Sequence, residues 1–167
     1  MTTPGADRTG MNEADQRLQP FVRSKVFTNL FAHGMELVEE TASYLDNGGR
    51  QAAKELVRED AMTYAGISMR LTTRLMQIAS WLLVLRAVRD GEMTEAEAQD
   101  EKYRIGPADS CDRHPDELKA LPNELVELIH ETDTLYSRIK RLDTDLFVSP
   151  ELAEVEGDAK GRIAALH

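Results

Sequence analysis

Hydrophobic residues recur every three or four positions over most of this chain, a period that predicts α-helices. Proline is absent between Pro20 and Pro107, and such an interval favours long helices. We therefore expect an all-α fold, an up-down helical bundle with a very long central helix over residues 22–147. Residues 1–21 and 148–167 are rich in polar residues, glycine and proline, so we expect flexible tails at both ends.

The first predicted helix runs from about Ser24, a suitable N-cap, to about Asp46. Gly34 lies on its apolar face and would allow a neighbouring helix to approach closely. Asn47-Gly48-Gly49 should end the helix, because glycine readily adopts the left-handed cap conformation. The expected buried face consists of Phe27, Phe31, Gly34, Val38, Ala42 and Leu45.

The second predicted helix extends from about Arg50 to about Asp90, and Gly91 follows as its cap. Gly66 lies near its middle, where glycine costs about 1 kcal/mol relative to alanine. Either close packing requires this glycine, or the helix bends there.

Two apolar stripes about 100° apart run along this second helix. One interpretation is a central helix surrounded by the other helices of its own chain. The other is that one stripe packs inside the bundle and Met69, Thr72, Met76, Ala79 and Leu83 of the second form a two-fold dimer interface. The first stripe is Tyr64, Ser68, Leu71, Leu75, Ile78, Leu82 and Leu85, and the second is Ala65, Met69, Thr72, Met76, Ala79, Leu83 and Ala87.

A third face of the same helix carries Arg70, Arg74, Gln77 and Trp81. Charged helix residues most often face solvent or form ion pairs, here with acids such as Glu36, Glu39 and Glu40 of the first helix. Because Trp and Arg are enriched in interfaces, these four residues are also a candidate partner-binding face.

The C-terminal half contains a capping box, a loop and a long helix. Thr94-Glu95-Ala96-Glu97 predicts a short helix to about Tyr103, and residues 106–121 are expected to form a loop. The last helix should begin at Pro122, a favoured first-turn residue. Its apolar seam is Leu125, Leu128, Thr132, Leu135, Ile139, Leu142 and Leu146.

Charge and cysteine content restrict the possible partners. A net charge of −10 argues against binding to nucleic acid or anionic lipid, which requires clustered Lys and Arg. The longest dense apolar region, residues 78–88, is too short to span a bilayer. With Cys111 as the only cysteine, no intramolecular disulfide can form, which fits the reducing cytoplasm.

The sequence also lacks the motifs of catalysis and metal binding. His33, His114, His130 and His167 show no metal-ligand spacing, and no phosphate loop or nucleophile elbow occurs. Asp109, Cys111, Asp112 and His114 cluster in one loop, but a solvated loop explains this composition more simply than a metal or redox site. We therefore expect no enzyme activity, no metal and no cofactor.

The run Met69-Arg-Leu-Thr-Thr-Arg-Leu-Met-Gln-Ile-Ala-Ser-Trp-Leu-Leu83 resembles the signature of the regulator of CtrA degradation (RcdA) family. It mixes Arg, Thr, Met and Trp in an order that helix propensity does not demand. Similar flanking features extend the resemblance over about residues 22–145. They are Phe27 with Leu30, Tyr64-Ala65, Arg86-Ala87-Val88, Gly91-Glu92-Met93-Thr94, Glu101-Lys102 and Leu121-Pro122.

The resemblance implies a homodimeric helical bundle that acts as an adaptor in the cytoplasm of alphaproteobacteria. Such an adaptor delivers cell-cycle regulators, meaning response-regulator or transcription-factor cargo, to the primed ClpXP protease. The family is not catalytic, and its C-terminal segment is implicated in function. Two alternatives are a structural dimeric interaction module in another complex, and a phosphotransfer bundle using His33 or His130. Neither histidine has the Lys-Gly context of phosphotransfer modules.

Overall fold

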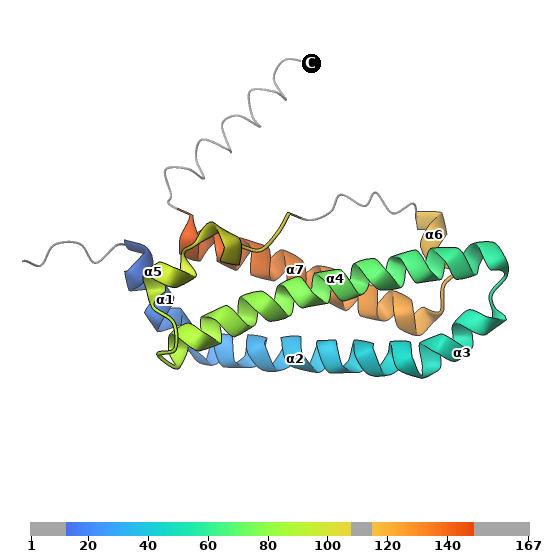
Figure 1. Ribbon diagram of the computed structural model, residues 1–167, viewed down its shortest axis with the longest axis horizontal. Coiled ribbons are helices and arrows are strands. Elements are labelled where there is room, and N and C mark those ends of the chain that lie inside the picture. The colour runs from blue at the N-terminus through green and yellow to red at the C-terminus, as the bar shows by residue number, and fades with distance from the viewer. Residues whose placement is uncertain (1–12, 108–114, 149–167) are drawn as a thin grey trace, which may run out of the picture.

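Three long helices form the body of the protein, α2 (Lys25–Asp46), α4 (Arg58–Arg89) and α7 (Asn123–Phe147). They lie side by side in a computed structural model that describes residues 13–107 and 115–148 (Figure 1). The described residues contain helices and no strands, which confirms the predicted all-α bundle with a long central helix.

Shorter helices close the two ends of this body. At one end lie α1 (Glu13–Val22), α5 (Glu95–Ala98) and the 3₁₀ helix η1 (Glu101–Tyr103), and at the other lie α3 (Gly48–Glu55) and α6 (Pro115–Lys119) (Figure 1). The capping box predicted at Thr94 is confirmed, with both of its reciprocal hydrogen bonds. The loop predicted over 106–121 is wrong for 115–119, which form α6.

The predicted N-terminal arm, residues 1–21, is also wrong over its last nine residues, because Glu13–Val22 form α1. Leu18 and Val22 of this helix are 1% and 0% exposed and pack among α2, α4 and α7. Phe21 also packs against the core, so three apolar side chains dock this short and largely polar helix. The rest of the predicted arm, the predicted C-terminal tail beyond Val148, and Cys111 with its neighbouring His114 lie outside the described residues.

Helix α2 begins as predicted, since the Ser24 hydroxyl accepts a hydrogen bond from the Phe27 amide. Its buried face is rotated by about one residue from the predicted one. Ala42 is exposed, and Phe31, Val38 and Leu45 are only half-buried, because α2 packs against both α4 and α7 rather than one neighbour. The buried residues are Phe27, Leu30, Gly34, Leu37, Thr41 and Tyr44.

The predicted unbroken helix from Arg50 to Asp90 is interrupted. Helix α3 ends at Glu55, α4 begins at Arg58, and Leu56 and Val57 between them are extended, with ψ of 146° and 155°. Leu56 packs against the core there, so the break gains apolar contact in exchange for helical hydrogen bonds. The sequence shows no glycine or proline at this point, and the break depends on packing.

The two glycines after α2 have a different role from the predicted left-handed cap. Among the described glycines, positive φ occurs at Gly91, where φ is 75°, as predicted for the end of α4. Gly49 is buried instead, and a Cβ there would overlap the Tyr64 hydroxyl and the Tyr44 ring. It is therefore needed for the close approach of α3 to α2 and α4.

Helix α4 is continuous through Gly66 and about 48 Å long at 1.5 Å per residue. Its first predicted stripe is confirmed as the buried one, apart from Ser68, which is half-buried. By length and composition alone α4 could cross a membrane. In this fold one apolar stripe of the helix packs against α2 and α7, and 39% of its most apolar window is buried.

The predicted seam of α7 is confirmed except for Leu142, which is half-buried. A second line of buried residues at intervals of seven, Ile129, Tyr136 and Asp143, lies beside it. Helix α7 therefore buries a wider face than a simple coiled-coil stripe, since it contacts both α2 and α4.

Replacing Gly34 with valine should destabilise the bundle by about 2–3 kcal/mol, because overpacking forces neighbouring side chains out of their rotamers. A Cβ at Gly34 would overlap Cδ1 of Leu82, which is 0% exposed. Urea unfolding followed by circular dichroism measures the effect. Gly66→Ala is the matched control, since a Cβ there meets nothing within 4 Å, and it should be neutral or stabilising by up to about 1 kcal/mol. Equal stability of the two variants would contradict the tight α2–α4 contact.

Candidate partner-binding surface

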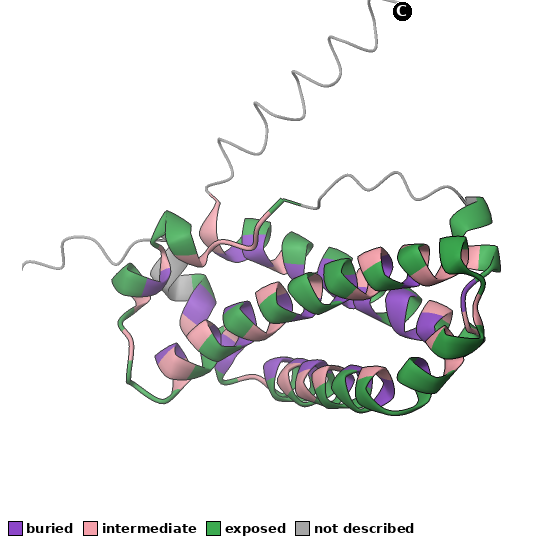
Figure 2. Cartoon of the chain, turned by 45° about the vertical axis from the view of Figure 1, so that its right-hand side comes forward, coloured by how far each residue is buried: buried purple, intermediate pink, exposed green. Residues whose placement is uncertain are grey.

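Helix α4 exposes four large hydrophobic residues in one straight line. Met62, Met69, Met76 and Leu83 are 70%, 72%, 65% and 50% exposed, respectively, and they recur every seven residues. Seven residues correspond to about two turns, so the line extends for about 32 Å. Ala65, Thr72, Thr73 and Ser80 fill the intervals and are also exposed. We call these eight residues the α4 apolar face, and Figure 2 shows exposed positions along this side of the bundle.

The α4 apolar face carries no charge, although 30% of the chain is charged. Between Met62 and Leu83 the only charged residues are Arg70 and Arg74, and both point away from the line of methionines. A contiguous exposed apolar stripe of this length is unusual for a protein surface and marks an interaction site.

The structure contradicts one of the two interpretations of the second stripe, and the dimer interface stays a prediction. The other helices of the chain cover the first stripe and leave the second uncovered, so the fully surrounded central helix is wrong. Of the predicted interface residues, Met69, Thr72, Met76 and Leu83 are exposed, and Ala79 is half-buried. They lie together on one accessible face, as a partner interface requires.

A narrow cavity of about 130 Å³ borders this face between α2 and α4. Its walls are almost entirely apolar, and Met76 lies at its edge. The Thr41 hydroxyl in its lining is buried and has no hydrogen-bond partner among the described residues. The remaining lining residues are Val38, Ala42, Leu45, Thr72, Leu75 and Ala79.

The predicted partner-binding face does not form as one surface. Trp81 is 2% exposed, and its indole N–H donates to Asp143 at 2.7 Å, so its predicted place on a surface is wrong. Arg74 makes its contacts within the chain: it forms an ion pair with Asp133 of α7 at 2.6 Å and stacks on Tyr136. The predicted pairing with acids of α2 is thus wrong for Arg74. Arg70 is exposed and Gln77 is half-buried.

Asp143 is the centre of a buried polar cluster that the sequence analysis missed. Its Oδ1 accepts from Trp81 and from the Arg104 guanidinium, at 2.7 and 2.9 Å. Arg104 also donates to the Ala98 carbonyl at 2.6 Å and lies over the Phe147 ring. The cluster joins α4, α5, α7 and the segment after η1. An aspartate seven residues after Tyr136 on a buried helix line is the sequence signal that could have revealed it.

Burial dominates the electrostatics of this cluster. Desolvation raises the pKa of Asp143 above its usual value, although the Trp81 hydrogen bond, the Arg104 charge and the Ile105 amide all act to lower it. Desolvation likewise lowers the pKa of Arg104, against the opposing effect of Asp143. Both shifts show that the pair is held in a poorly solvated site, where losing one partner is costly.

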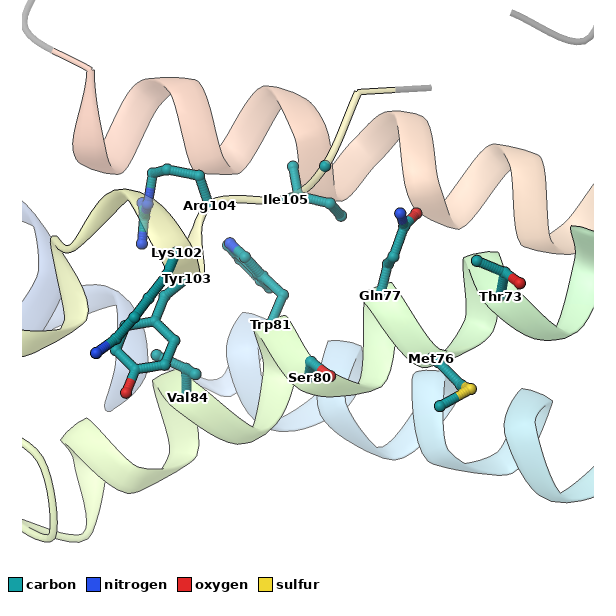
Figure 3. Close-up of a pocket in the computed structure, with 11 residues that line it drawn as sticks. Thr73, Met76, Gln77, Ser80, Trp81, Val84, Lys102, Tyr103, Arg104 and Ile105 are labelled. Carbon is teal, nitrogen blue, oxygen red and sulfur yellow. The ribbon is translucent and has the colours of Figure 1, made fainter. Parts of the chain in front are cut away.

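A second hollow of about 310 Å³ lies between α4 and residues 101–106, which we call the strap. The Tyr136 hydroxyl donates to the Gly106 carbonyl and anchors the end of the strap to α7. Figure 3 shows Gln77, Ser80 and Trp81 of α4 facing Lys102, Tyr103 and Ile105 of the strap. We call this hollow the strap groove. Its other lining residues are Thr73, Met76, Val84, Arg104 and Gly106.

Side chains that could bind a metal or take part in catalysis are dispersed over the described residues. Within residues 13–107 and 115–148, no three His, Cys, Asp or Glu side chains gather in a metal-binding arrangement. His33 and His130, the candidates for phosphotransfer, are exposed on α2 and α7. The most distinctive surface features are therefore the α4 apolar face and the two hollows beside it.

These features define the class of this protein. It is a helical-bundle protein with an uncharged helix face that other proteins can reach. Comparison with protein families matches residues 18–167 to the family described as "Protein of unknown function (DUF1465)". Among solved structures, the chain is similar to RcdA from Caulobacter crescentus CB15. The two are 46% identical with a TM-score of 0.65, over 78% of this chain and 98% of that one. A search of curated proteins found no match.

The chain belongs to the RcdA family. The family profile matches nearly all of it, and the likeness to the C. crescentus protein covers almost the whole of that relative. The resemblance inferred from the Met69–Leu83 run is thereby confirmed.

Proposed function

We propose that this protein is a non-catalytic adaptor that works in the cytoplasm as a homodimer and tethers cell-cycle regulatory proteins to the primed ClpXP protease. The observation that carries the proposal is the α4 apolar face, an exposed interaction surface in a chain that belongs to the RcdA family. The adaptor role is what membership of this family implies.

The α4 apolar face suits a second copy of the same chain. In a two-fold interface a residue near the symmetry axis meets its own copy, so a charge there would oppose a like charge. A face without charge avoids this repulsion. Methionine adapts its shape to an opposing helix, and Ala65, Thr72 and Ser80 leave room for close approach. A Cβ added at Gly66, beside the line, would meet nothing within 4 Å outside the backbone of its own helix, so the surface is open there.

Tethering requires no chemistry beyond binding. An adaptor that holds cargo and unfoldase together raises the local concentration of cargo, which increases the rate of capture without new contacts between them. A rigid bundle with separate faces on α2, α4 and α7 offers surfaces for more than one partner, and a dimer would double them.

Degradation of a purified cell-cycle cargo by ClpXP and its priming factors should accelerate at least several-fold when the full chain is added, while the chain itself is not consumed. Arg70→Glu tests one exposed cation of the predicted partner-binding face, and we expect it to weaken capture. Arg138→Glu, an exposed arginine of α7 with the same charge change, is the control. No acceleration, together with no binding to unfoldase or cargo in a pull-down where a known adaptor binds, would exclude the adaptor role.

The alternative is a structural dimeric interaction module in an unrelated complex. The α4 apolar face supports this role equally, because it specifies a protein contact without naming the partner. Purification of the protein from its native cell separates the two hypotheses. Protease subunits or their cargo should accompany an adaptor, whereas a stable set of other proteins would favour the structural module.

A further inference from the structure

The strap groove has an electrostatic character opposite to that of the whole protein. The chain carries a net charge of −10, yet the charged residues that line this groove are Lys102 and Arg104, with no carboxylate among them. Arg104 is engaged by Asp143 and the Ala98 carbonyl. Lys102 therefore provides the accessible positive charge of the groove.

The ammonium of Lys102 lies 5.0 Å from the centre of the Tyr103 ring and also makes a weak contact with Asp100. Its side chain is 65% exposed, and its ammonium lies 3.8 Å from Asp100, which is itself half exposed. Exposed pairs at this separation contribute little, so the ammonium can bind another carboxylate. Met76, Val84 and the Tyr103 ring give the groove apolar walls, and Thr73, Gln77 and Ser80 supply hydrogen-bonding groups. This surface fits a short acidic segment with small apolar side chains.

The chain leaves the described fold beside this groove. Helix α7 ends at Phe147, whose ring lies 3.3 Å below the guanidinium of Arg104, a lining residue of the groove. The ten residues that follow Val148 are Ser-Pro-Glu-Leu-Ala-Glu-Val-Glu-Gly-Asp. They include four carboxylates, Leu152 and Val155, and no lysine or arginine.

The segment after Val148 is long enough to cross the strap groove. The α4 wall of the groove, from Thr73 to Val84, extends for about 17 Å at 1.5 Å per residue. Ten residues span up to about 33 Å when extended, which is enough to leave α7 and cross the groove. A segment tethered this close has an effective concentration in the millimolar range, so weak contacts suffice to fill the site.

We propose that residues 149–158 dock in the strap groove of their own chain, with their carboxylates toward Lys102 and their apolar side chains toward Met76 and Val84. The docking of this segment does not depend on the adaptor role. Its effect on the dimer surface rests on the proposed function. Because Met76 belongs to both the strap groove and the α4 apolar face, a docked segment would border the dimer surface and restrict access to it.

Paramagnetic relaxation measured by NMR on the full chain tests this docking. A spin label at Ala159→Cys, in a Cys111→Ser background, should selectively broaden the amide signals of Ser80, Val84 and Lys102. Signals at the far end of α4, near Arg58, should be unaffected. The selective broadening should fall several-fold in Lys102→Glu and also at 1 M salt, where the Debye length is about 3 Å. Lys140→Glu, an exposed lysine of α7 outside the groove, should leave it unchanged.

The labelling measurements are made in a Met69→Asp background, which removes the proposed dimer contact at a residue outside the groove. In that background, a mixture of isotope-labelled chain without the spin label and unlabelled chain carrying it should show no broadening. Broadening in this mixture would assign the groove to the segment of a second copy and overturn docking within one chain. Weak, uniform broadening in the single-species sample, or equal broadening in the Lys102→Glu and Lys140→Glu variants, would also overturn it. None of these outcomes depends on protease delivery, so failure of docking is distinguishable from failure of the adaptor role.

Discussion

Met76→Asp is expected to convert the proposed dimer to a monomer. Met76 lies on the α4 apolar face and is 65% exposed, so the substitution should leave the fold of a single chain intact. In a two-fold dimer it would bury two carboxylates close together without partners. Unpaired buried charges cost about 3 kcal/mol or more, which corresponds to at least about a 100-fold weaker dimer. Light scattering at micromolar concentration measures the change in mass.

Val26→Asp is the matched control for this experiment. Val26 is an exposed hydrophobic residue on α2, 50% exposed, and it lies outside the α4 apolar face. This variant should retain the mass of the wild type, and both variants should show the helical circular dichroism of the wild type. A wild-type chain that is monomeric at tens of micromolar, or a Met76→Asp dimer, would exclude the proposed interface.

Asp143→Ala should destabilise the fold by about 3–5 kcal/mol, a large part of the stability of a typical domain. The substitution leaves the Arg104 guanidinium half-buried without its carboxylate and the buried Trp81 indole N–H without its acceptor. It also removes the group that links α4 and α7 to the segment after η1. Urea unfolding measures the loss. Because Trp81 is the only tryptophan, its fluorescence reports directly on this site.

Asp145→Ala is the control for this second prediction. Asp145 lies two residues further along α7, on its exposed side, and the hydrogen bond from Arg17 reaches its backbone carbonyl rather than its carboxylate. We expect a change within about 0.5 kcal/mol, as for most surface substitutions. A similar small effect of Asp143→Ala would mean that solvent replaces the lost partners and that the cluster contributes little to stability.

Much of the helical architecture could be predicted from local patterns. The N-cap at Ser24, the capping box at Thr94 and the cap at Gly91 each depend on a few neighbouring residues. The first stripe of α4 and most of the α7 seam follow from a period that helix geometry imposes. Such signals do not require knowledge of which helices meet.

Local patterns fail to predict a residue's environment where that environment depends on several neighbouring helices at once. The face of α2 was misplaced by about one residue because α2 contacts two helices, so its buried arc is centred between them. The break at Leu56–Val57 was missed because no local signal marks it. Trp81 was placed on a surface because its acceptor, Asp143, lies 62 residues away in the sequence.

Local propensity and periodicity specify the helical class, several helix ends and the two apolar stripes on the longest helix. The order of residues from Met69 to Leu83 also carries the resemblance to the RcdA family. The exposure of Met69, Met76 and Leu83 and the burial of Leu71, Ile78 and Leu82 follow from the packing of the helices. Both stripes have similar hydrophobicity, and burial depends on where α2 and α7 pack. For the same reason the Asp143 cluster and the strap groove could be found only once distant segments had been brought together.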